Sequence, residues 1–108
     1  MSYRVLITDS AAMDLEDIYN YIAMHDAPRK ADYILGKIED AFQSLSEFPD
    51  RGSYPKELSA IGIYEYREIY FKPYRIIYKR VEKIVYISLI VDGRRSFQTI
   101  LNRRLFEV

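Results

Sequence analysis

Cationic and aromatic side chains that could bind an anion are concentrated at residues 66–80, where the sequence reads YREIYFKPYRIIYKR. Their alternation with β-branched residues is typical of strands. An arginine within a strand can hold a phosphate or carboxylate through two parallel hydrogen bonds and can stack on an aromatic ring. The cations of this part of the chain cluster in predicted strands and turns: Arg67, Lys72, Arg75, Lys79, Arg80, Lys83, Arg94 and Arg95. An arginine in a strand interior next to tyrosines, such as Arg67 or Arg75, is a more specific candidate than a lysine in a loop.

A structural role for these arginines remains open, because a cross-strand Arg–Glu pair packed by tyrosines would give the same pattern. The alternation predicts Tyr74 and Tyr78 on one face of a strand and Arg75 and Lys79 on the other. Arg67 is equally compatible with an anion-binding and a structural role.

The residue types that build common catalytic and metal sites are scarce. The chain has no cysteine and only one histidine, His25, which falls at the predicted end of a helix and is interpreted as a surface or capping residue. A Gly-rich phosphate loop, HExxH and GxSxG are all missing, so we expect no metal and no cofactor. Six acidic residues are expected to be solvated charges on helix faces: Asp14, Glu16, Asp17, Asp32, Glu39 and Asp40.

The N-terminal half predicts a strand and two helices. Residues 3–9 alternate like a short strand, and Asp9 or Ser10 can cap a helix that ends near His25. Its apolar residues recur at helical spacing, and a longer stripe follows Pro28, which suits the first turn of a second helix. Because only a few residues separate the helices, they should be antiparallel neighbours.

The C-terminal half predicts three strands after a Pro- and Gly-containing loop at 48–55. Residues 57–65 can hold a helical turn, and strands are expected at 64–71, 74–80 and 84–91. The last is apolar on both faces, as in a central strand that is covered on both sides. The tail, 94–108, is the least core-like segment, with Arg103 and Arg104 expected to be exposed. Phe97, Ile100, Leu101 and Leu105 form a stripe at helical spacing in this tail, which could either contact a target or only seal the open edge of the sheet.

The predicted fold is therefore a single α+β domain over residues 1–108 with the order β-α-α-β-β-β. Two antiparallel helices pack on one face of a four-stranded, mostly antiparallel sheet, and a short C-terminal tail or helix follows. The other face of the sheet is expected to be partly open. No apolar run approaches the ~20 residues of a membrane span, so no membrane partner is expected.

Charge is unevenly distributed along a chain whose net charge is zero. Residues 1–66 hold 6 Lys and Arg against 12 Asp and Glu, whereas residues 67–108 hold 10 against 4. This division suggests an acidic partner, although acidic helices lying beside a basic sheet would also produce it. A nucleic-acid-binding module of this size would usually be net basic, which disfavours that class.

Four segments, in the expected order, resemble the RelE/ParE superfamily of toxins from type II toxin–antitoxin systems. AAMDLEDIYNYIA (11–23) resembles the first helix of that family, and LSEFPDRG (45–52) its Leu-x-x-x-Pro-x-x-Gly junction. YREIYFKPYRIIYKR resembles its tyrosine–arginine hairpin, and VYISLIVDGRRSFQTIL resembles its last strand with a Gly-Arg-Arg turn. The resemblance spans nearly the whole chain and implies the same α+β fold.

The superfamily implies two mechanisms, since RelE-like toxins cleave mRNA in the ribosome and ParE-like toxins poison DNA gyrase. Arg75 and Arg95 match two arginines of the RelE pattern, and Arg67 falls near its first lysine, but Ile69 and Leu101 stand near the second lysine and the tyrosine. Arginine stabilises a phosphorane well but transfers protons poorly. The ParE branch is therefore favoured, without catalytic residues. The alternative is a ribosome-dependent endoribonuclease that uses Arg67, Arg75 and Arg95.

The ParE resemblance implies a cytoplasmic, growth-arresting protein of the plasmid-stabilisation type. Its partners would be a small cognate antitoxin with an extended acidic and apolar C-terminal segment, and DNA gyrase as target; the ribosome replaces gyrase in the alternative. DNA would be contacted only through the antitoxin. The residues expected to bind target or antitoxin are Arg67, Tyr74, Arg75, Arg94, Arg95, Arg103 and Arg104.

Overall fold

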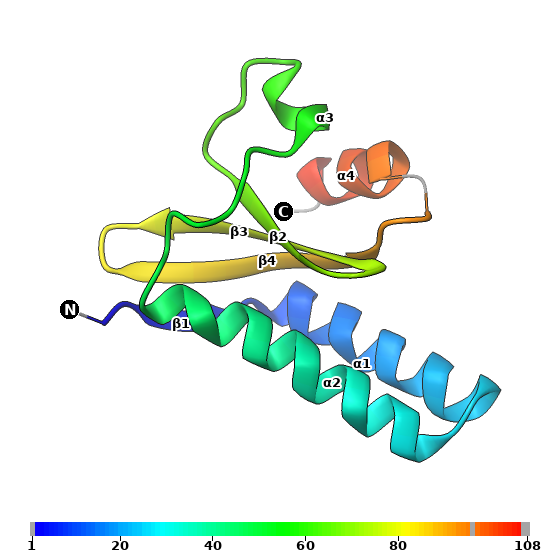
Figure 1. Ribbon diagram of the computed structural model, residues 1–108. Coiled ribbons are helices and arrows are strands. Elements are labelled where there is room, and N and C mark those ends of the chain that lie inside the picture. Colours follow the sequence, from blue (N-terminus) through cyan, green and yellow to red (C-terminus); the bar gives the residue numbers. More distant parts are fainter. Residues whose placement is uncertain (1, 96, 107–108) are drawn as a thin grey trace.

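The computed structural model describes residues 2–95 and 97–106, and leaves the side chains of Asn102, Arg103, Leu105 and Phe106 undescribed. The elements, in chain order, are β1 (Arg4–Ile7), α1 (Asp9–His25), α2 (Pro28–Gln43), the 3-10 turn η1 (Ser44–Ser46), α3 (Lys56–Ser59), β2 (Arg67–Phe71), β3 (Tyr74–Val81), β4 (Ile84–Asp92) and α4 (Phe97–Phe106) (Figure 1). The predicted α+β class and element order are confirmed, and the C-terminal segment forms a helix.

The sheet has the strand order β1-β4-β3-β2. β3 pairs antiparallel with both β2 and β4, whereas β1 lies parallel to β4. The register of the β1–β4 pair runs from Arg4 opposite Ile84 to Ile7 opposite Ile87. β4 is therefore central over its first half only, and beyond Ile87 none of the described residues forms a strand beside it on the β1 side.

The helices α1 and α2 form one layer below the sheet (Figure 1). Their predicted stripes are confirmed, since Leu15, Ile22, Ile38 and Phe42 are buried in one core with residues of the strands. The expected N-cap at Asp9 or Ser10 is wrong. The backbone is extended at Thr8, whose side chain accepts a hydrogen bond from the amide of Ala11, so the cap lies one residue earlier.

The second face of the sheet is covered, which corrects the expectation that it would be partly open. α3 and α4 lie on this side, opposite α1 and α2 (Figure 1). Leu58 of α3, Phe97 and Leu101 of α4, and Leu89 of β4 are buried together in a second apolar cluster. The tail is thus not the least core-like segment, because the apolar side chains of Phe97 and Leu101 are buried against the sheet.

An irregularity in β4 allows this strand to serve both cores. The β3–β4 register shifts at Ser88, so that Ile77 faces Leu89 while Tyr78 faces Ile87. The extra residue, Ser88, creates a β-bulge. After the bulge, the side chains of β4 alternate in the opposite phase between the two faces of the sheet. Ile87 accordingly belongs to the helix-side core and Leu89 to the second one.

β2 begins at Arg67, three residues later than predicted. Tyr64 and Glu65 are exposed and belong to the loop that leads from α3 to the sheet. The preceding loop is anchored at Gly52, whose amide donates to the buried hydroxyl of Tyr78, while that hydroxyl donates to the carbonyl of Pro49 at 2.7 Å. The Leu-x-x-x-Pro-x-x-Gly segment is therefore fixed to the side chain of Tyr78, next to the point where Ser53 pairs with Glu68 of β2.

Candidate functional site

Arg75 lies on the second face of the sheet and is bound by carboxylates. Its Nη1 and Nη2 donate to the two oxygens of Glu57, both at 2.9 Å, and its Nε donates to Glu68 at 2.8 Å. The ring of Phe97 lies 4.0 Å from the guanidinium carbon. We call these four residues the Arg75 cluster; it joins α3, β2, β3 and α4.

Burial makes these contacts strong. The side chain of Arg75 is 12% exposed and that of Glu68 is 4% exposed. The hydrogen bonds from Arg75 lower the pKa of Glu57 below its usual value, and the hydrogen bonds to Glu57 raise the pKa of Arg75. The guanidinium is thus fully charged and its three donor nitrogens are already engaged by protein oxygens.

Arg67 lies on the opposite face of the sheet. It stands across from Tyr78, which belongs to the helix-side core. Its Nη1 donates to the carbonyl of Gly52 at 2.8 Å and its Nη2 to the hydroxyl of Tyr54 at 3.1 Å, with the Tyr54 ring 4.6 Å from the guanidinium carbon. Arg67 therefore holds the 49–54 loop against β2. The structure does not bring Arg67 and Arg75 together.

The other predicted docking residues of the hairpin region differ in accessibility. Tyr74 is buried at 8% exposure, and this burial raises the pKa of its hydroxyl. Arg94 is exposed and donates two hydrogen bonds to the carboxylate of Asp92, from Nε to Oδ1 at 2.9 Å and from Nη2 to Oδ2 at 2.6 Å. These hydrogen bonds lower the pKa of Asp92. Arg95 is exposed and forms no ion pair with any side chain that the structure describes.

The expectation that Arg104 is an exposed cation is wrong. Its guanidinium pairs with Asp14 of α1 and donates to the carbonyl of Ser88 at 2.8 Å, and its side chain is 20% exposed. The side chain of Arg103 lies outside the described residues. Arg104 therefore fastens α4 to α1 and β4, and only a structural rearrangement would free it for a partner.

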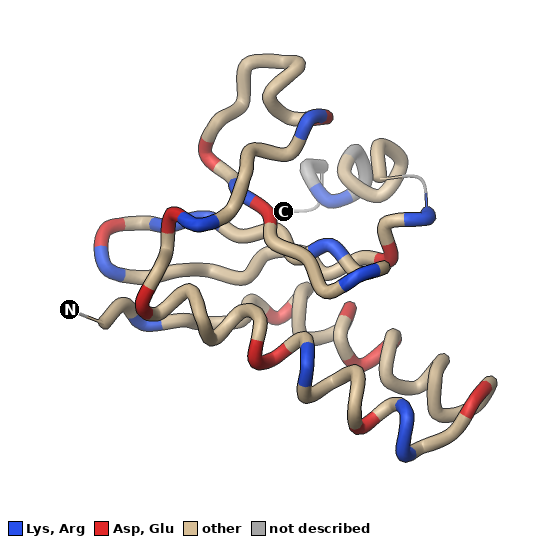
Figure 2. The backbone as a smooth tube through the Cα atoms, in the orientation of Figure 1, with Lys and Arg blue, Asp and Glu red and all other residues tan. Residues whose placement is uncertain are grey.

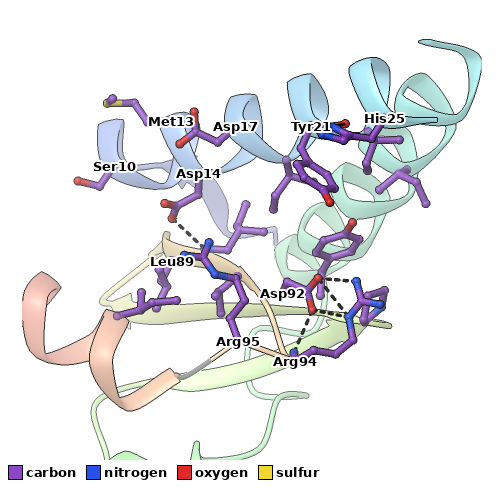
Figure 3. A pocket seen from close by; sticks show the side chains of 18 of the residues that line it. Ser10, Met13, Asp14, Asp17, Tyr21, His25, Leu89, Asp92, Arg94 and Arg95 are labelled. Atoms are coloured by element: carbon purple, nitrogen blue, oxygen red, sulfur yellow. Dashed lines mark hydrogen bonds and ion pairs between the residues drawn. The ribbon is translucent and has the colours of Figure 1, made fainter. Parts of the chain in front are cut away.

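A groove of about 1240 Å³ runs beside β4, between α1 and α4. Figure 3 shows Met13, Asp17 and Tyr21 of α1 on one side and Leu89 and Asp92 of β4 across from them. Arg94 and Arg95 line one end. We call this hollow the β4 groove; it contains the accessible members of the predicted docking set.

The charge division seen in the sequence is partly neutralised within the molecule. Cations of the second half of the chain pair with acids of the first half: Arg67 and Arg80 with Asp50, Arg75 with Glu57, and Arg104 with Asp14. Figure 2 accordingly shows acidic and basic residues interspersed along the sheet and the loop above it. The sequence division by itself is therefore weak support for an acidic partner.

Sequence reasoning missed two acidic residues that organise these sites, Glu57 and Asp14, whereas the Arg75–Glu68 contact is the cross-strand Arg–Glu pair that it had left open. Glu57 and Glu68 hold Arg75, and Asp14, expected to be solvated, accepts hydrogen bonds from Arg104 and from the amide of Ile90 at 3.1 Å. One signal was available, because Asp14 lies three residues after buried Ala11 and so on the flank of the core-facing stripe. The other five acids of that group are exposed as expected.

The part of the chain that the structure describes holds neither a metal-ligand cluster nor a helix able to span a membrane. Among residues 2–95 and the described part of α4, no cluster of three or more acidic or histidine side chains is placed to hold a metal ion. His25 is exposed, stacks on Tyr21 and contacts its carbonyl through Nδ1, as expected of a surface residue at a helix end. Over the same residues, no helix has the length and apolarity required to cross a membrane.

Comparisons with known proteins agree on one family. Residues 5–97 match the family described as the ParE toxin of the type II toxin–antitoxin system parDE. Toxin ParE3 of Caulobacter vibrioides is 28% identical over 101 residues, which span 94% of this chain and 97% of that protein.

Solved structures share the fold. The chromosomal ParDE toxin–antitoxin system of P. aeruginosa matches with a TM-score of 0.71 and 19% identity over 84% of this chain and 96% of that chain. The RelBE2 toxin–antitoxin complex of Mycobacterium tuberculosis matches with a TM-score of 0.58 and 22% identity over 85% and 92%. The family match covers residues 5–97, which hold β2, β3, β4, α3 and the helical hairpin α1–α2. The chain belongs to the ParE toxin family of type II toxin–antitoxin systems.

Proposed function

We propose that this protein arrests growth in the cytoplasm by docking on DNA gyrase and that a small antitoxin, the product of the adjoining gene, neutralises it. The family membership supports a toxin with such a partner. The Arg75 cluster is the observation that favours docking over RNA cleavage. A phosphate could reach the Arg75 guanidinium only by displacing Glu57 and Glu68, whose three hydrogen bonds hold it.

Proton transfer also argues for the docking mechanism. Cleavage at a 2′-hydroxyl needs a base and an acid beside the arginine that stabilises the phosphorane. The carboxylates nearest Arg75 are ion-paired to it, and the lowered pKa of Glu57 makes this group a poor acid. Arg67 is on the other face of the sheet and cannot complete a site around Arg75.

The proposed docking residues are Arg94 and Arg95 at the end of the β4 groove, with Arg103 as a further candidate. Arg67, Tyr74, Arg75 and Arg104 are proposed to act by holding the surface in shape, because each is engaged or buried in the structure. Contact with DNA in this proposal occurs only through the antitoxin.

Three assays test the proposal. Expression of the chain alone should arrest growth, co-expression of the adjoining gene should restore it, and the purified toxin should inhibit supercoiling by gyrase. Arg94→Ala with Arg95→Ala should weaken inhibition, whereas Lys72→Ala, an exposed cation of the β2–β3 turn, serves as a matched control and should not. Unimpaired supercoiling together with reproducible mRNA cuts at ribosomal positions would replace this mechanism by the ribonuclease one.

A further inference from the structure

Residues 54–66, which contain α3, leave the sheet and return to it at the same place; we call them the α3 strap. Ser53 and Glu68 close its base, because the amide of each donates to the carbonyl of the other, at 3.1 and 2.7 Å. Within the strap, the amide of Ile63 donates to the carbonyl of Leu58 at 2.9 Å. Figure 1 shows α3 and the loop after it projecting from the sheet on the side of α4. A compact loop whose ends meet can open as a unit while its base stays closed.

Two neighbouring side chains attach the α3 strap to the second face of the sheet. The carboxylate of Glu57 accepts hydrogen bonds from Nη1 and Nη2 of Arg75, both at 2.9 Å. Leu58 is 1% exposed within the second apolar cluster. The tip of the strap is not attached in this way, since Ile61 and Tyr64 are 63% and 59% exposed. Opening the strap therefore requires Glu57 and Leu58 to leave their places on the sheet.

The places that Glu57 and Leu58 occupy show which ligand the underlying site accepts. Arg75 binds one carboxylate through two donor nitrogens, the geometry in which arginine holds an acid most strongly. Leu58 belongs to an apolar cluster that also contains Ile77, Leu89, Val91, Phe97 and Leu101. The side chain of Glu57 is 29% exposed and that of Arg75 is 12% exposed, so a competing carboxylate can approach from the side of Glu57. The site thus accepts an acidic residue with an apolar neighbour.

A protein segment fits this site better than a nucleic acid does. The buried carboxylate of Glu68 stays bound to Nε of Arg75 at 2.8 Å, and its negative charge opposes a backbone that carries a phosphate at every nucleotide. The apolar cluster beside it favours an aliphatic or aromatic side chain. A peptide supplies one carboxylate and one apolar side chain at adjacent positions, as α3 itself does.

We propose that the α3 strap is an autoinhibitory contact. In the free toxin, Glu57 and Leu58 occupy a docking site for the target, and an acidic residue of gyrase with an apolar neighbour takes their place when the strap opens. This inference rests on the proposed gyrase target. Arg75 has a carboxylate partner in both states, so its charge is never left buried and unpaired. Because the target competes with a segment of the toxin itself, its apparent affinity is reduced to the extent that the strap is closed.

Amide hydrogen exchange of the full-length toxin, measured by mass spectrometry with and without purified gyrase, tests whether the strap opens. Peptides that cover residues 55–64, whose amides donate to carbonyls within the strap, should exchange at least about 3-fold faster in the complex. Peptides of β3 provide the internal reference, because its pairing with β2 and β4 is the same in both states.

Substitution of Glu57 tests the autoinhibition separately. Glu57→Gln keeps the size of the side chain but removes the charge that binds Arg75, so the strap opens more often. The purified variant should therefore inhibit supercoiling at an about 3- to 10-fold lower concentration than the unsubstituted toxin. Glu65→Gln, which changes an exposed acid of the same strap, is the matched control and should leave the inhibitory concentration unchanged. The exchange measurement needs no variant and decides the matter if Glu57→Gln does not fold.

The outcomes separate this inference from the proposed function. A gyrase complex in which the strap exchanges as in the free toxin, or a folded Glu57→Gln variant that inhibits no better than the unsubstituted toxin, overturns autoinhibition and leaves gyrase intact as target. A strap that opens with the antitoxin or with a single-stranded oligonucleotide, but not with gyrase, assigns the site to that ligand and equally overturns it. If the toxin neither binds nor inhibits gyrase, both proposals fail.

Discussion

At the scale of single residues, the guanidinium of Arg75 joins two carboxylates from different elements, Glu57 of α3 and Glu68 of β2. Removing the cation while Glu68 remains buried costs more than the pair contributes, because the buried carboxylate loses its charged partner. This asymmetry predicts how the cluster responds to substitution.

Arg75→Ala is expected to lower the free energy of unfolding by about 3 kcal/mol or more. Arg75→Met combined with Glu68→Met should recover at least half of that loss, because apolar side chains of similar volume replace a buried pair at little cost. Urea unfolding monitored by circular dichroism measures both. Arg94→Ala, which removes an exposed pair, is the control and should change stability by less than about 1 kcal/mol. Equal losses in the single and double variants would contradict the assignment.

Glu57 makes stability depend on pH. Its folded-state pKa is lowered by Arg75, so its contribution is fully present above its unfolded pKa of about 4.3 and is lost as pH falls through the folded value. The urea midpoint should therefore decrease below about pH 4.3, and Glu57→Gln should flatten this dependence. Asp92 is the second carboxylate whose pKa is lowered, and the Asp92→Asn variant distinguishes its contribution to the pH dependence from that of Glu57. A Glu57→Gln variant with an unchanged profile would show that the Arg75 cluster does not contribute.

Residue types could be predicted from the sequence, but their partners could not. The alternation correctly placed Tyr74 and Arg75 on opposite faces. The acid that meets Arg75 comes from α3, and the acid that meets Arg104 comes from α1. No local sequence pattern encodes contacts between residues so distant in the chain. In the sequence, an arginine that carboxylates hold therefore could not be told from an arginine that is free to bind a phosphate.

At the scale of elements, Gly52 has no space for a side chain. An added Cβ would lie 2.7 Å from the carbonyl oxygen of Glu68 and 2.7 Å from the hydroxyl of Tyr78. Gly52→Ala should therefore destabilise the protein by about 2 kcal/mol or more. Gly36→Ala is the matched control, because nothing lies within 4 Å of the added atom, and it should stabilise α2 by up to about 1 kcal/mol. Thermal unfolding should give a lower melting temperature for Gly52→Ala and a higher one for Gly36→Ala. A shift of both melting temperatures in the same direction would contradict the prediction.

The helix α4 contributes to stability as well as to any docking. Deleting residues 96–108 removes the buried side chains of Phe97 and Leu101, at about 1.5–3 kcal/mol each. The truncated protein is expected to unfold at a much lower temperature and to bind the dye ANS through the uncovered second core. Loss of growth arrest in such a variant would consequently say little about target contacts. An unchanged melting temperature would contradict the packing described for α4.

The elements themselves followed closely from periodicity, and the exceptions have identifiable causes. The helix stripes and the central position of residues 84–91 were predictable from apolar spacing. The bulge at Ser88 was not, because an apolar run without alternation conceals a change of phase. The apolar stripe of the tail was recognisable, but its spacing alone could not decide between sealing the sheet, as Phe97 and Leu101 do, and contacting a target.

At the scale of the whole molecule, the two apolar cores share one sheet, and we propose that residues 1–108 unfold as a single domain. Tyr78 lies in the helix-side core and Tyr66 packs against the second one. The chain has eleven tyrosines and no tryptophan, so a single tryptophan introduced by Tyr66→Trp or by Tyr78→Trp reports on one core at a time. Its emission should follow the same urea transition as far-UV circular dichroism. Two separated transitions would show that the α3–α4 layer folds independently.

The parallel pairing of β1 with β4 has a consequence for biosynthesis. Arg4 pairs with Ile84, so about 80 residues must be added before the first strand can meet its neighbour. At ribosomal speeds that interval lasts about 4 to 16 s. The α1–α2 hairpin, whose contacts are local, can form early in this period. Until translation reaches β4, the nascent hairpin keeps the apolar side chains of Leu15, Ile22 and Ile38 without their final cover, and this is the stage at which the chain is most prone to aggregate.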